Sequence, residues 1–518
     1  MLLTGLALGV VLGFVMQRGR FCVTGMIRDI FTQNSWRGFN ALLIVIAVHA
    51  IGLGALSSAG IITPAVKDFA PLAVVIGGTL FGMGIILAGG CASGTWYRSG
   101  EGLVGSWIAL AMYALTAAAM NAGALTWLDR AATSWTIEQS TIHGTLGVSR
   151  WWLIVPFSAL VAYLTVHFLK QEKHRPRMAT LAPKKRGVAH ILTEKPWHFY
   201  STAVVVGLLG VIAWPLSAAT GRNSGLGITT PSSDVARFIT TGDTARLNWG
   251  TLLVLGLLVG SFIAAKASGE FRVRVPDTTQ ATRSVCGGAL MGIGAVMAGG
   301  CNVGNGMVQT SLFSYQGWVG LAFIAVGIWV GAKLWLKPSE FSIAGNEPAV
   351  SSSPDATSAS LSVSPSTFDI SIAPGVLAGS TGGGVLTAEK TNVAEKTNVA
   401  DKTDVADTTD VVDKTDVAGA TGLKPQARSA EESKSIAGLR SLGAGQYALD
   451  TLGAVCPFPL LDAKDAMKLL EPGEELVIDF DCTQATDSIP RWASVDGHEV
   501  TNFEATGEAG WTITVKKG

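Results

Sequence analysis

Two cysteines occupy the same sequence context at two distant places in the chain. Residues 77–94 read GGTLFGMGIILAGGCASG and residues 287–304 read GGALMGIGAVMAGGCNVG, so Cys91 and Cys301 each follow a Gly-Gly pair, 210 positions apart. Thiols are weak hydrogen-bond donors that suit a soft, polarisable ligand. The repeated pattern predicts a duplicated membrane protein whose paired elements meet at a substrate site.

The glycines before the two cysteines predict interrupted helices. Gly90 and Gly300 end apolar runs about long enough to cross the roughly 30 Å hydrocarbon core. A helix that restarts after such a break points its N–H groups and positive dipole end at whatever lies beside the cysteine, which favours an anion. Alternatively, the glycines are packing faces between helices and each cysteine is a small apolar core residue. The repetition favours the site.

The composition is that of a membrane protein. Of the 518 residues, 48% are hydrophobic and 15% charged, and the mean hydropathy is +0.39. The formal net charge is zero and no basic, aromatic-interleaved face is evident, so we expect no nucleic-acid partner. The six cysteines lack zinc-binding spacing. We therefore expect no metal and no cofactor, and chemistry on single sulfurs rather than a disulfide framework.

The pattern of apolar runs predicts nine membrane spans with a defined direction. Basic residues crowd 170–186, after the fifth span, and cytoplasmic loops carry the excess of Lys and Arg. Counting from this loop places the N-terminus outside and the C-terminus in the cytoplasm. The spans are expected at about 2–16, 39–57, 70–88, 102–120, 151–169, 200–218, 249–265, 284–300 and 317–336.

The first four spans correspond to the last four, which gives repeats at about 1–120 and 200–336. An odd number of crossings separates equivalent spans, so the repeats are inverted, and the fifth span is a connector. Cys22 has Gly227 as its counterpart and lies in QRGRFCVTG, which predicts a re-entrant mouth with Arg20 beside it. Arg18 and Arg98 are further candidates to attract an anion, although positive-inside topology explains them equally well.

The composition changes twice after the last span. Residues 337–445 are rich in small and polar residues and contain five hexads at 389–418, which predicts a disordered linker that tethers a C-terminal domain. From 446 to 518 the strand-like runs YALDTLG and EELVIDFD, two helical runs and a final hairpin, EVTNFEA with GWTITVKK, predict a small α+β two-layer sandwich.

Cys456 is the candidate sulfur nucleophile of this last domain. It stands in Cys-Pro-Phe-Pro just before a predicted helix, and a helix N-terminus lowers the pKa of a thiol and favours the thiolate. The alternative is a buried structural cysteine beside a turn. Cys482 is a weaker candidate for a second thiol, because Asp479, Asp481 and Asp487 would disfavour its thiolate.

These motifs resemble two known families. The doubled Gly-Gly-Cys with Cys22 resembles the YeeE/YedE family of membrane proteins, whose characterised members import thiosulfate, over about 1–336. The tail is similar to the TusA/SirA-like sulfur-carrier domain called YeeD, with CPFP as its CPxP motif, over 446–518. The resemblance implies thiosulfate uptake through Cys22, Cys91 and Cys301, and sulfur acceptance or processing at Cys456. Cys286 lies outside the family pattern and is assigned to packing.

The expected partners are the thiosulfate ion, the lipid bilayer and downstream sulfur-transfer proteins. Two alternatives stay open: a membrane-anchored sulfurtransferase that acts through Cys456, and a transporter of another small sulfur or selenium species. Whether the C-terminal domain is an enzyme that transfers sulfur or decomposes thiosulfate is also open. The sequence contains no nucleotide-binding P-loop, so it leaves the energy source undefined.

Overall fold

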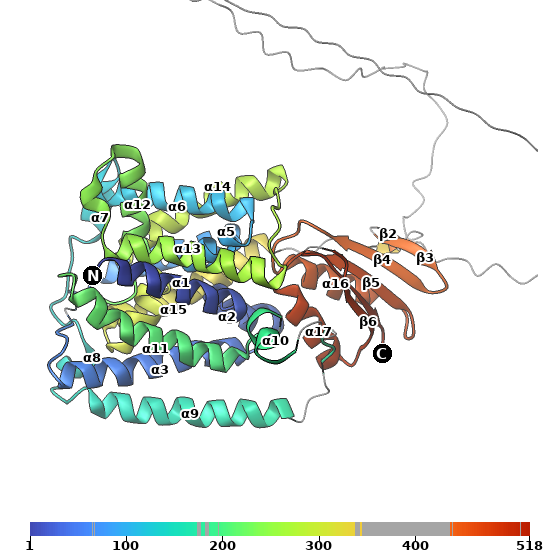
Figure 1. Ribbon diagram of the computed structural model, residues 1–518, viewed down its shortest axis with the longest axis horizontal. Helices are drawn as coiled ribbons and strands as arrows, with labels where there is room; N and C mark the ends of the chain where they lie inside the picture. The colour runs from blue at the N-terminus through green and yellow to red at the C-terminus, as the bar shows by residue number, and fades with distance from the viewer. Residues whose placement is uncertain are drawn as a thin grey trace, which may run out of the picture. The chain divides into compact units, whose positions relative to one another are not determined.

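The computed structural model describes most of the chain outside the low-complexity region (Figure 1). The described residues are 1–64, 66, 68–173, 178–181, 186–194, 196–336, 342–343, 436–437, 439–507 and 509–518. The hexads at 389–418 and nearly all of the predicted linker lie outside these residues.

The helical part begins with a first set of six helices. A short helix follows a long one twice, after α1 and after α4. The set is α1 (Leu3–Arg18), α2 (Val23–Gln33), α3 (Arg37–Ser58), α4 (Pro71–Leu87), α5 (Ala92–Gly100) and α6 (Val104–Ala122). Short helices and a long one connect it to the second set: α7 (Thr126–Ala132), α8 (Ile142–Thr145), α9 (Trp151–Lys173) and α10 (Gly187–Thr193).

The second set repeats this order. It comprises α11 (Phe199–Ala218), α12 (Thr229–Thr241), the 3-10 turn η1 (Thr244–Arg246), α13 (Trp249–Ser268), α14 (Thr278–Met297), the π-helical segment η2 (Gly304–Gln309) and α15 (Tyr315–Trp335). Side-chain caps define where its long helices begin: Asn248 accepts the Gly250 and Thr251 N–H groups, Asp277 accepts that of Gln280, and Ser314 accepts that of Gly317. Such caps satisfy N–H groups that the first turn leaves free.

The two sets pack on each other as the predicted inverted repeats. α1 packs on α13 as α11 packs on α3, and α4 packs on α15 as α14 packs on α6. The end of α1 lies beside the start of α11, because the Trp197 N–H donates to the Arg18 carbonyl over 3.1 Å. Equivalent helices therefore run in opposite directions, as Figure 1 shows for α1 and α11.

Glycines allow α4 and α14 to approach closely and antiparallel. A Cβ at Gly77 would lie 2.5 Å from the Ala298 nitrogen, and one at Gly287 would lie 2.4 Å from the Ala88 nitrogen. The packing interpretation is thus correct for these glycines in the early part of each repeated run. It does not account for the Gly-Gly pairs at the ends of the runs.

Eight helices among the described residues are long and apolar enough to cross a membrane, judged by length and composition. Two of these spans combine a long helix with the short one that follows it, namely Leu3–Gln33 and Pro71–Gly100. Of the nine predicted spans, the eighth, 284–300, is not among these eight helices; it falls in α14, which has 20 residues but begins with the polar sequence TTQATRS. Polar residues in its first turns lower its hydropathy while its length is preserved.

Cys286 does not pack in the protein interior. The structure exposes its side chain on the outer surface of α14. The assignment of Cys286 to packing is therefore wrong, because the α14 residues that pack against α4 and α6 are the glycines and small residues on its other face.

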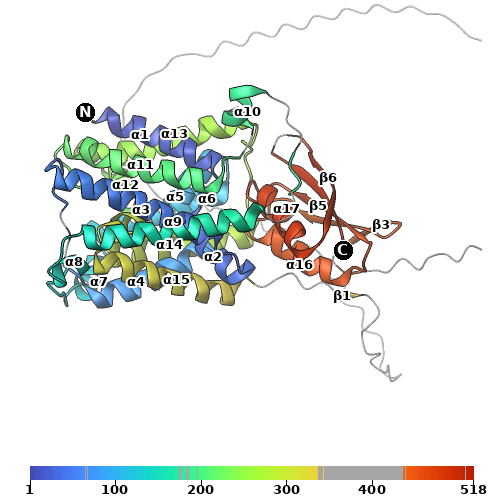
Figure 2. The same cartoon turned by 90° about the horizontal axis from the view of Figure 1, so that it is seen from below.

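The C-terminal part folds as a five-stranded sheet with two helices on one face, as Figures 1 and 2 show. The strand order is β3-β4-β5-β7-β6, and β4 and β5 are parallel. Their bounds are β3 (Arg440–Gly443), β4 (Gln446–Thr451), α16 (Phe458–Leu469), β5 (Glu475–Phe480), α17 (Ala485–Asp496), β6 (Glu499–Ala505) and β7 (Trp511–Lys516). Two short strands, β1 (Ser342–Ile343) and β2 (Ile436–Ala437), pair with each other.

The predicted two-layer α+β sandwich is confirmed, with one addition at its start. β3 pairs with β4 but falls within the range that the sequence placed at the end of the linker, 337–445. The strand is short and all four of its residues are exposed, so it lacks the alternation of buried and exposed residues by which strands are recognised.

Candidate anion pathway and sulfur-acceptor site

The first Gly-Gly-Cys motif forms a helix break, as predicted. α4 ends at Leu87, Gly89 adopts a left-handed backbone with φ of +70°, and Cys91 caps the restarted helix α5. The Gly94 N–H donates to the Cys91 sulfur over 3.3 Å. A left-handed residue is needed to turn the chain here, and glycine adopts that conformation at no steric cost. The Arg98 guanidinium donates to the Gly89 carbonyl and thereby satisfies one backbone group that the break leaves free.

The second motif forms a matching break that is held differently. α14 ends at Met297, Gly299 has φ of +71°, and the chain continues into η2. The Asn305 amide donates to the carbonyls of Ala298 (2.8 Å) and Gly300 (2.9 Å), and Gln316 donates to the Asn305 oxygen over 3.0 Å. Neutral amides thus satisfy the carbonyls of this break.

Cys22 lies next to Cys91 rather than apart from it. Cys22 occupies the N-cap position of α2 without a side-chain cap, and its thiol forms a hydrogen bond with that of Cys91. A Cβ at Gly94 would lie 3.2 Å from the Cys91 sulfur and 3.8 Å from the Cys22 sulfur. The N-termini of α2 and α5 therefore converge on two neighbouring thiols, whereas the sequence assigned the paired N-termini to Cys91 and Cys301. An anion near these thiols would meet the positive ends of two helices.

Cys301 joins this cluster through its neighbour Asn302. The Cys91 thiol interacts with the Asn302 amide, and Tyr113 interacts with both Cys91 and Cys301. Within the described residues, the Asn302 amide has no partner among nitrogen and oxygen atoms, although it is buried. Such a group is costly to bury unless a ligand or water pairs with it. Sequence reasoning missed Asn302 and Tyr113; only the replacement of Ala92 by Asn302 between the two copies could have indicated the former.

Arg18 and Arg20 form a buried ion-pair group with one carboxylate. Arg18 lies 3.5 Å and Arg20 3.2 Å from Glu270, which also accepts a 2.6 Å hydrogen bond from Gln17. Burial acts to raise the pKa of Glu270, but Arg20 and Arg18 outweigh it and hold that pKa below its usual range. Arg20 also donates to Thr486. The single carboxylate of Glu270 offsets one of these two positive charges, and Arg98, which donates to the Gly89 carbonyl instead, is the better candidate to attract an anion.

Glu101 is a second carboxylate, near Arg98, and its pKa is raised whereas that of Glu270 is lowered. Burial, followed by the negative charge of Glu270, raises the pKa of Glu101 to about 7, against the effects of Arg98, Arg274 and Arg20. Glu101 is therefore partly protonated near neutral pH, and to that extent it leaves the charge of Arg98 uncompensated.

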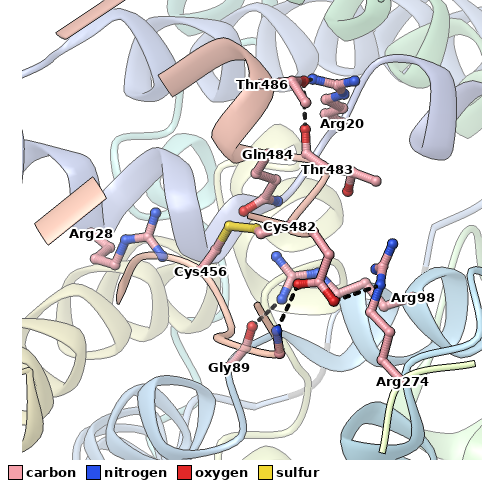
Figure 3. Close-up of a disulfide and its surroundings, with 12 residues drawn as sticks. Arg20, Arg28, Gly89, Arg98, Arg274, Cys456, Cys482, Thr483, Gln484 and Thr486 are labelled. Atoms are coloured by element: carbon pink, nitrogen blue, oxygen red, sulfur yellow. Dashed lines mark hydrogen bonds and ion pairs between the residues drawn. A yellow bond between two sulfur atoms is a disulfide. The ribbon is translucent and has the colours of Figure 1, made fainter. Parts of the chain in front are cut away.

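The C-terminal domain contacts the helix ends around the first break (Figure 3). Arg274 lies 3.4 Å from Asp481, and Gln484 donates to the Tyr97 hydroxyl over 3.4 Å. Val455 lies 3.7 Å from the position that a Cβ on Gly89 would take. A cavity of about 1030 Å³ is lined by Cys22 and by Cys456 together with residues of both parts. One space thus connects a thiol of the helical part with the candidate nucleophile of the domain.

A separate cavity of about 240 Å³ is lined by residues in and around α8. Figure 1 shows α8 at the end of the helices where the N-terminus lies. The cavity lining includes His143, Arg150 and the hydroxyl residues Ser140, Thr141 and Ser311. Burial and the neighbouring Arg150 lower the pKa of His143, so its ring is neutral and Arg150 supplies the positive charge of this cavity.

Cys456 and Cys482 form a disulfide, which corrects the expectation that the cysteines act singly. Their Cα atoms are 6.4 Å apart, at the ends of the adjacent parallel strands β4 and β5. The carboxylates that argued against Cys482 are each engaged: Asp479 by Thr512, Asp481 by Arg274 and Asp487 by Arg491. Cys456 does precede α16, as predicted, but in the disulfide form it carries no free thiol.

The fold and the site define a polytopic membrane transporter of inverted repeats with interrupted helices, joined to a small sulfur-handling domain. The chain belongs to the family described as "Sulphur transport", which it matches over residues 18–330, and it matches "Sulfurtransferase TusA" over residues 447–517.

Three relatives support both assignments. The thiosulfate transporter TsuA of Escherichia coli strain K12 is 49% identical over 338 residues, which cover 65% of this chain and 94% of that protein. TsuA of Spirochaeta thermophila is 32% identical over 346 residues, or 64% and 98% of the two chains. The putative sulfur carrier protein TsuB of Escherichia coli K12 is 54% identical over 69 residues, or 13% and 92%.

Proposed function

We propose that the chain imports thiosulfate through its glycine-broken helices and transfers the sulfane sulfur to Cys456 of the C-terminal domain. The cavity shared by Cys22 and Cys456 carries this proposal, because it joins the end of a thiol-lined path to a sulfur acceptor. The names of the two transporter relatives supply the substrate, and the helix N-termini and thiols fit a soft dianion.

The site balances attraction against release. An ion that crosses a pore must bind strongly enough to enter and weakly enough to leave. Around Cys22 and Cys91 the attraction comes from N–H groups and neutral thiols, whereas the full charge of Arg98 lies toward the exit. Thiosulfate would pass from Cys301 and Asn302 to Cys91 and Cys22, and then to the cavity that contains Cys456.

The basic residues support one orientation of the chain in the membrane. The helix ends that contact the C-terminal domain carry Arg20, Arg274 and Arg283, and the last of these lies 5.8 Å over the Phe458 ring. Lys and Arg are concentrated on the cytoplasmic side of membrane proteins. The C-terminal domain is accordingly cytoplasmic and the N-terminus outside. We assign the transporter to residues 1–336, the tether to 337–445 and the carrier to 446–518.

At the acceptor, reduced Cys456 attacks the terminal sulfur of thiosulfate. The Cys456 thiolate forms a bond with this sulfur as the S–S bond of thiosulfate breaks, which yields a Cys456 persulfide and releases sulfite. The helix N-terminus of α16 favours the thiolate. Removing thiosulfate at the exit lowers its free concentration there and favours net inward flux.

Uptake of radiolabelled thiosulfate by cells tests the proposal. Cys91→Ala and Cys301→Ala should each lower the uptake rate by about tenfold or more, since one lost hydrogen bond to a charged ligand is worth roughly 1.5–3 kcal/mol. Cys286→Ala, at an exposed position on α14, is the matched control and should transport normally.

The same experiment separates transport from the sulfurtransferase alternative. If uptake survives Cys91→Ala and Cys301→Ala but fails with Cys456→Ala, the chain is chiefly a membrane-anchored enzyme.

Competition by selenium analogues of thiosulfate tests the other alternative, a transporter of another sulfur or selenium species. An analogue that is taken up in preference to thiosulfate would replace it as the substrate.

A further inference from the structure

The two cysteines of the C-terminal domain are held together by more than their own bond. β4 and β5 are parallel neighbours, so the loops after them lie side by side. Asp481 accepts the Gly453 N–H over 3.0 Å and thus ties the loop before Cys456 to the residue before Cys482. The Thr451 hydroxyl donates to the Asp479 carbonyl over 2.8 Å. These bonds do not involve sulfur, so the two thiols remain neighbours after the disulfide is reduced.

The helical part secures the same arrangement from the other side. Arg274 pairs with Asp481 where both side chains are more than nine-tenths buried. Cys456 and Cys482 line a small cavity together with Arg98 and Arg274 (Figure 3). Because Arg274 is paired with Asp481, Arg98 rather than Arg274 would stabilise anions that form or leave at the sulfur pair.

Cys456 itself is poorly accessible to another protein. It is 6% exposed and lies beneath the helix ends of the transporter. A persulfide formed there could reach an external acceptor only after the domain moved away. Cys482 can reach this persulfide without such a movement. The nearest sulfur that can attack the persulfide is therefore in the same domain.

Building on the proposed acceptance of sulfur at Cys456, we propose that Cys482 resolves the Cys456 persulfide and releases the sulfur as hydrosulfide. The Cys482 sulfur bonds to the Cys456 Sγ, the Cys456 S–S bond to the sulfane sulfur breaks, and that sulfur leaves as HS⁻ with the proton from Cys482. The two cysteines are oxidised to the disulfide by two electrons, and the sulfane sulfur is reduced to sulfide.

A single turnover requires only thiosulfate and the two cysteines of the domain. One thiolate, one thiol and one thiosulfate give one disulfide, one sulfite and one hydrosulfide. Each further turnover requires an external dithiol reductant, which attacks Cys482, the less buried of the two sulfurs, and converts the Cys456–Cys482 disulfide back to two thiols as it becomes a disulfide itself. The disulfide seen here is then the form of the domain after one turnover, and it cannot accept sulfur until it is reduced.

A single-turnover experiment on the full chain tests this reaction. The purified protein in detergent is reduced with a phosphine and desalted, so that no reductant remains. Thiosulfate is added, and the mixture is quenched with a bromobimane reagent that captures sulfite and hydrosulfide together. Wild type should release both in equal amounts, with one Cys456–Cys482 disulfide formed per hydrosulfide by peptide mass spectrometry. Release of sulfite alone by wild type would overturn the proposal.

Cys482→Ser distinguishes the resolving step from the accepting step. This variant should still release sulfite, keep a Cys456 peptide heavier by one sulfur atom, and lose hydrosulfide release by at least about tenfold. Cys286→Ser should behave as wild type. If Cys482→Ser releases hydrosulfide normally, or fails to release sulfite, Cys482 is not the resolving thiol. Loss of sulfite release in Cys456→Ser tests the proposed function separately; undiminished release would place acceptance elsewhere.

Discussion

The two glycine–cysteine breaks share a backbone but differ in charge. Gly89 and Gly299 turn the chain with nearly the same φ, +70° and +71°. The first break is closed by the Arg98 guanidinium and faces the C-terminal domain, whereas the second is closed by the Asn305 amide. Duplication therefore conserved the turn that exposes backbone groups, and divergence placed the cation on one side only. A symmetric scaffold thereby acquires an asymmetric electrostatic path, with its charged end toward the sulfur acceptor.

The largest difference in thiosulfate uptake should come from removing the positive charge of Arg98 at the first break. Arg98→Gln leaves a donor near the Gly89 carbonyl but deletes the positive charge, and we expect thiosulfate uptake in proteoliposomes to fall by about a hundredfold, or roughly 2.7 kcal/mol. Arg98→Lys keeps the charge and should retain much more activity. Equal losses in both variants would mean that Arg98 acts only as a support for the break.

A smaller but more specific effect is expected at the equivalent glycines that follow the cysteines. Gly94→Ala places a methyl group 3.2 Å from the Cys91 sulfur, whereas a Cβ at Gly304 meets no atom of the described residues within 4 Å. We expect Gly94→Ala to lower the uptake rate by about tenfold, because its methyl group crowds the Cys91 sulfur and fills space beside Cys22, and Gly304→Ala to transport nearly as wild type. Similar rates for the two alanine variants would contradict a path between Cys22 and Cys91.

The breaks themselves could be predicted from sequence, because Gly-Gly-Cys is a local signal that occurs twice. The order of elements in the C-terminal domain was predicted for the same reason: alternation in β4 and β5 and the prolines after Cys456 act locally. The proximity of Cys22 and Cys91 was not predicted. It depends on how α2 and α5 meet in space, and the expected counterpart of Cys22 carries no sulfur.

The residues that sequence reasoning misjudged are those whose partners are distant in the chain. Arg20 was expected to attract substrate, but it pairs with Glu270, 250 positions away in the chain. Cys482 was ranked low because of nearby aspartates, one of which pairs with Arg274. A charge read along the sequence has no partner until the fold supplies one, so electrostatic predictions from sequence alone are the least secure.

Near neutral pH, ionisation of Glu101 should modulate thiosulfate binding near Arg98. As the pH rises through about 7, Glu101 loses its proton, and its negative charge then offsets Arg98. Thiosulfate affinity, measured by calorimetry on the purified chain, should decrease by about threefold between pH 6 and pH 8. Glu101→Gln, which stays neutral, should flatten this dependence. An equally steep pH profile in that variant would exclude Glu101 as its source.

The smallest effect on thiosulfate binding is expected from a change where the C-terminal domain meets the helices, and this change separates the path from the acceptor. Asp481→Asn keeps an oxygen that can accept the Gly453 N–H but removes the charge that pairs with Arg274. Removing one partner of a buried ion pair leaves the other charge uncompensated, so the carrier should dock much less firmly and sulfite release after uptake should slow by about tenfold or more. Affinity of the helical part for thiosulfate should not change, because the thiols and Asn302 lie in the transporter.

The reference is a chain cut before residue 337, which should bind thiosulfate as tightly as the full chain. If Asp481→Asn and the truncation both weaken thiosulfate binding strongly, the domain builds part of the transport site. The charge difference between the two breaks would then serve docking of the domain rather than the path of the ion.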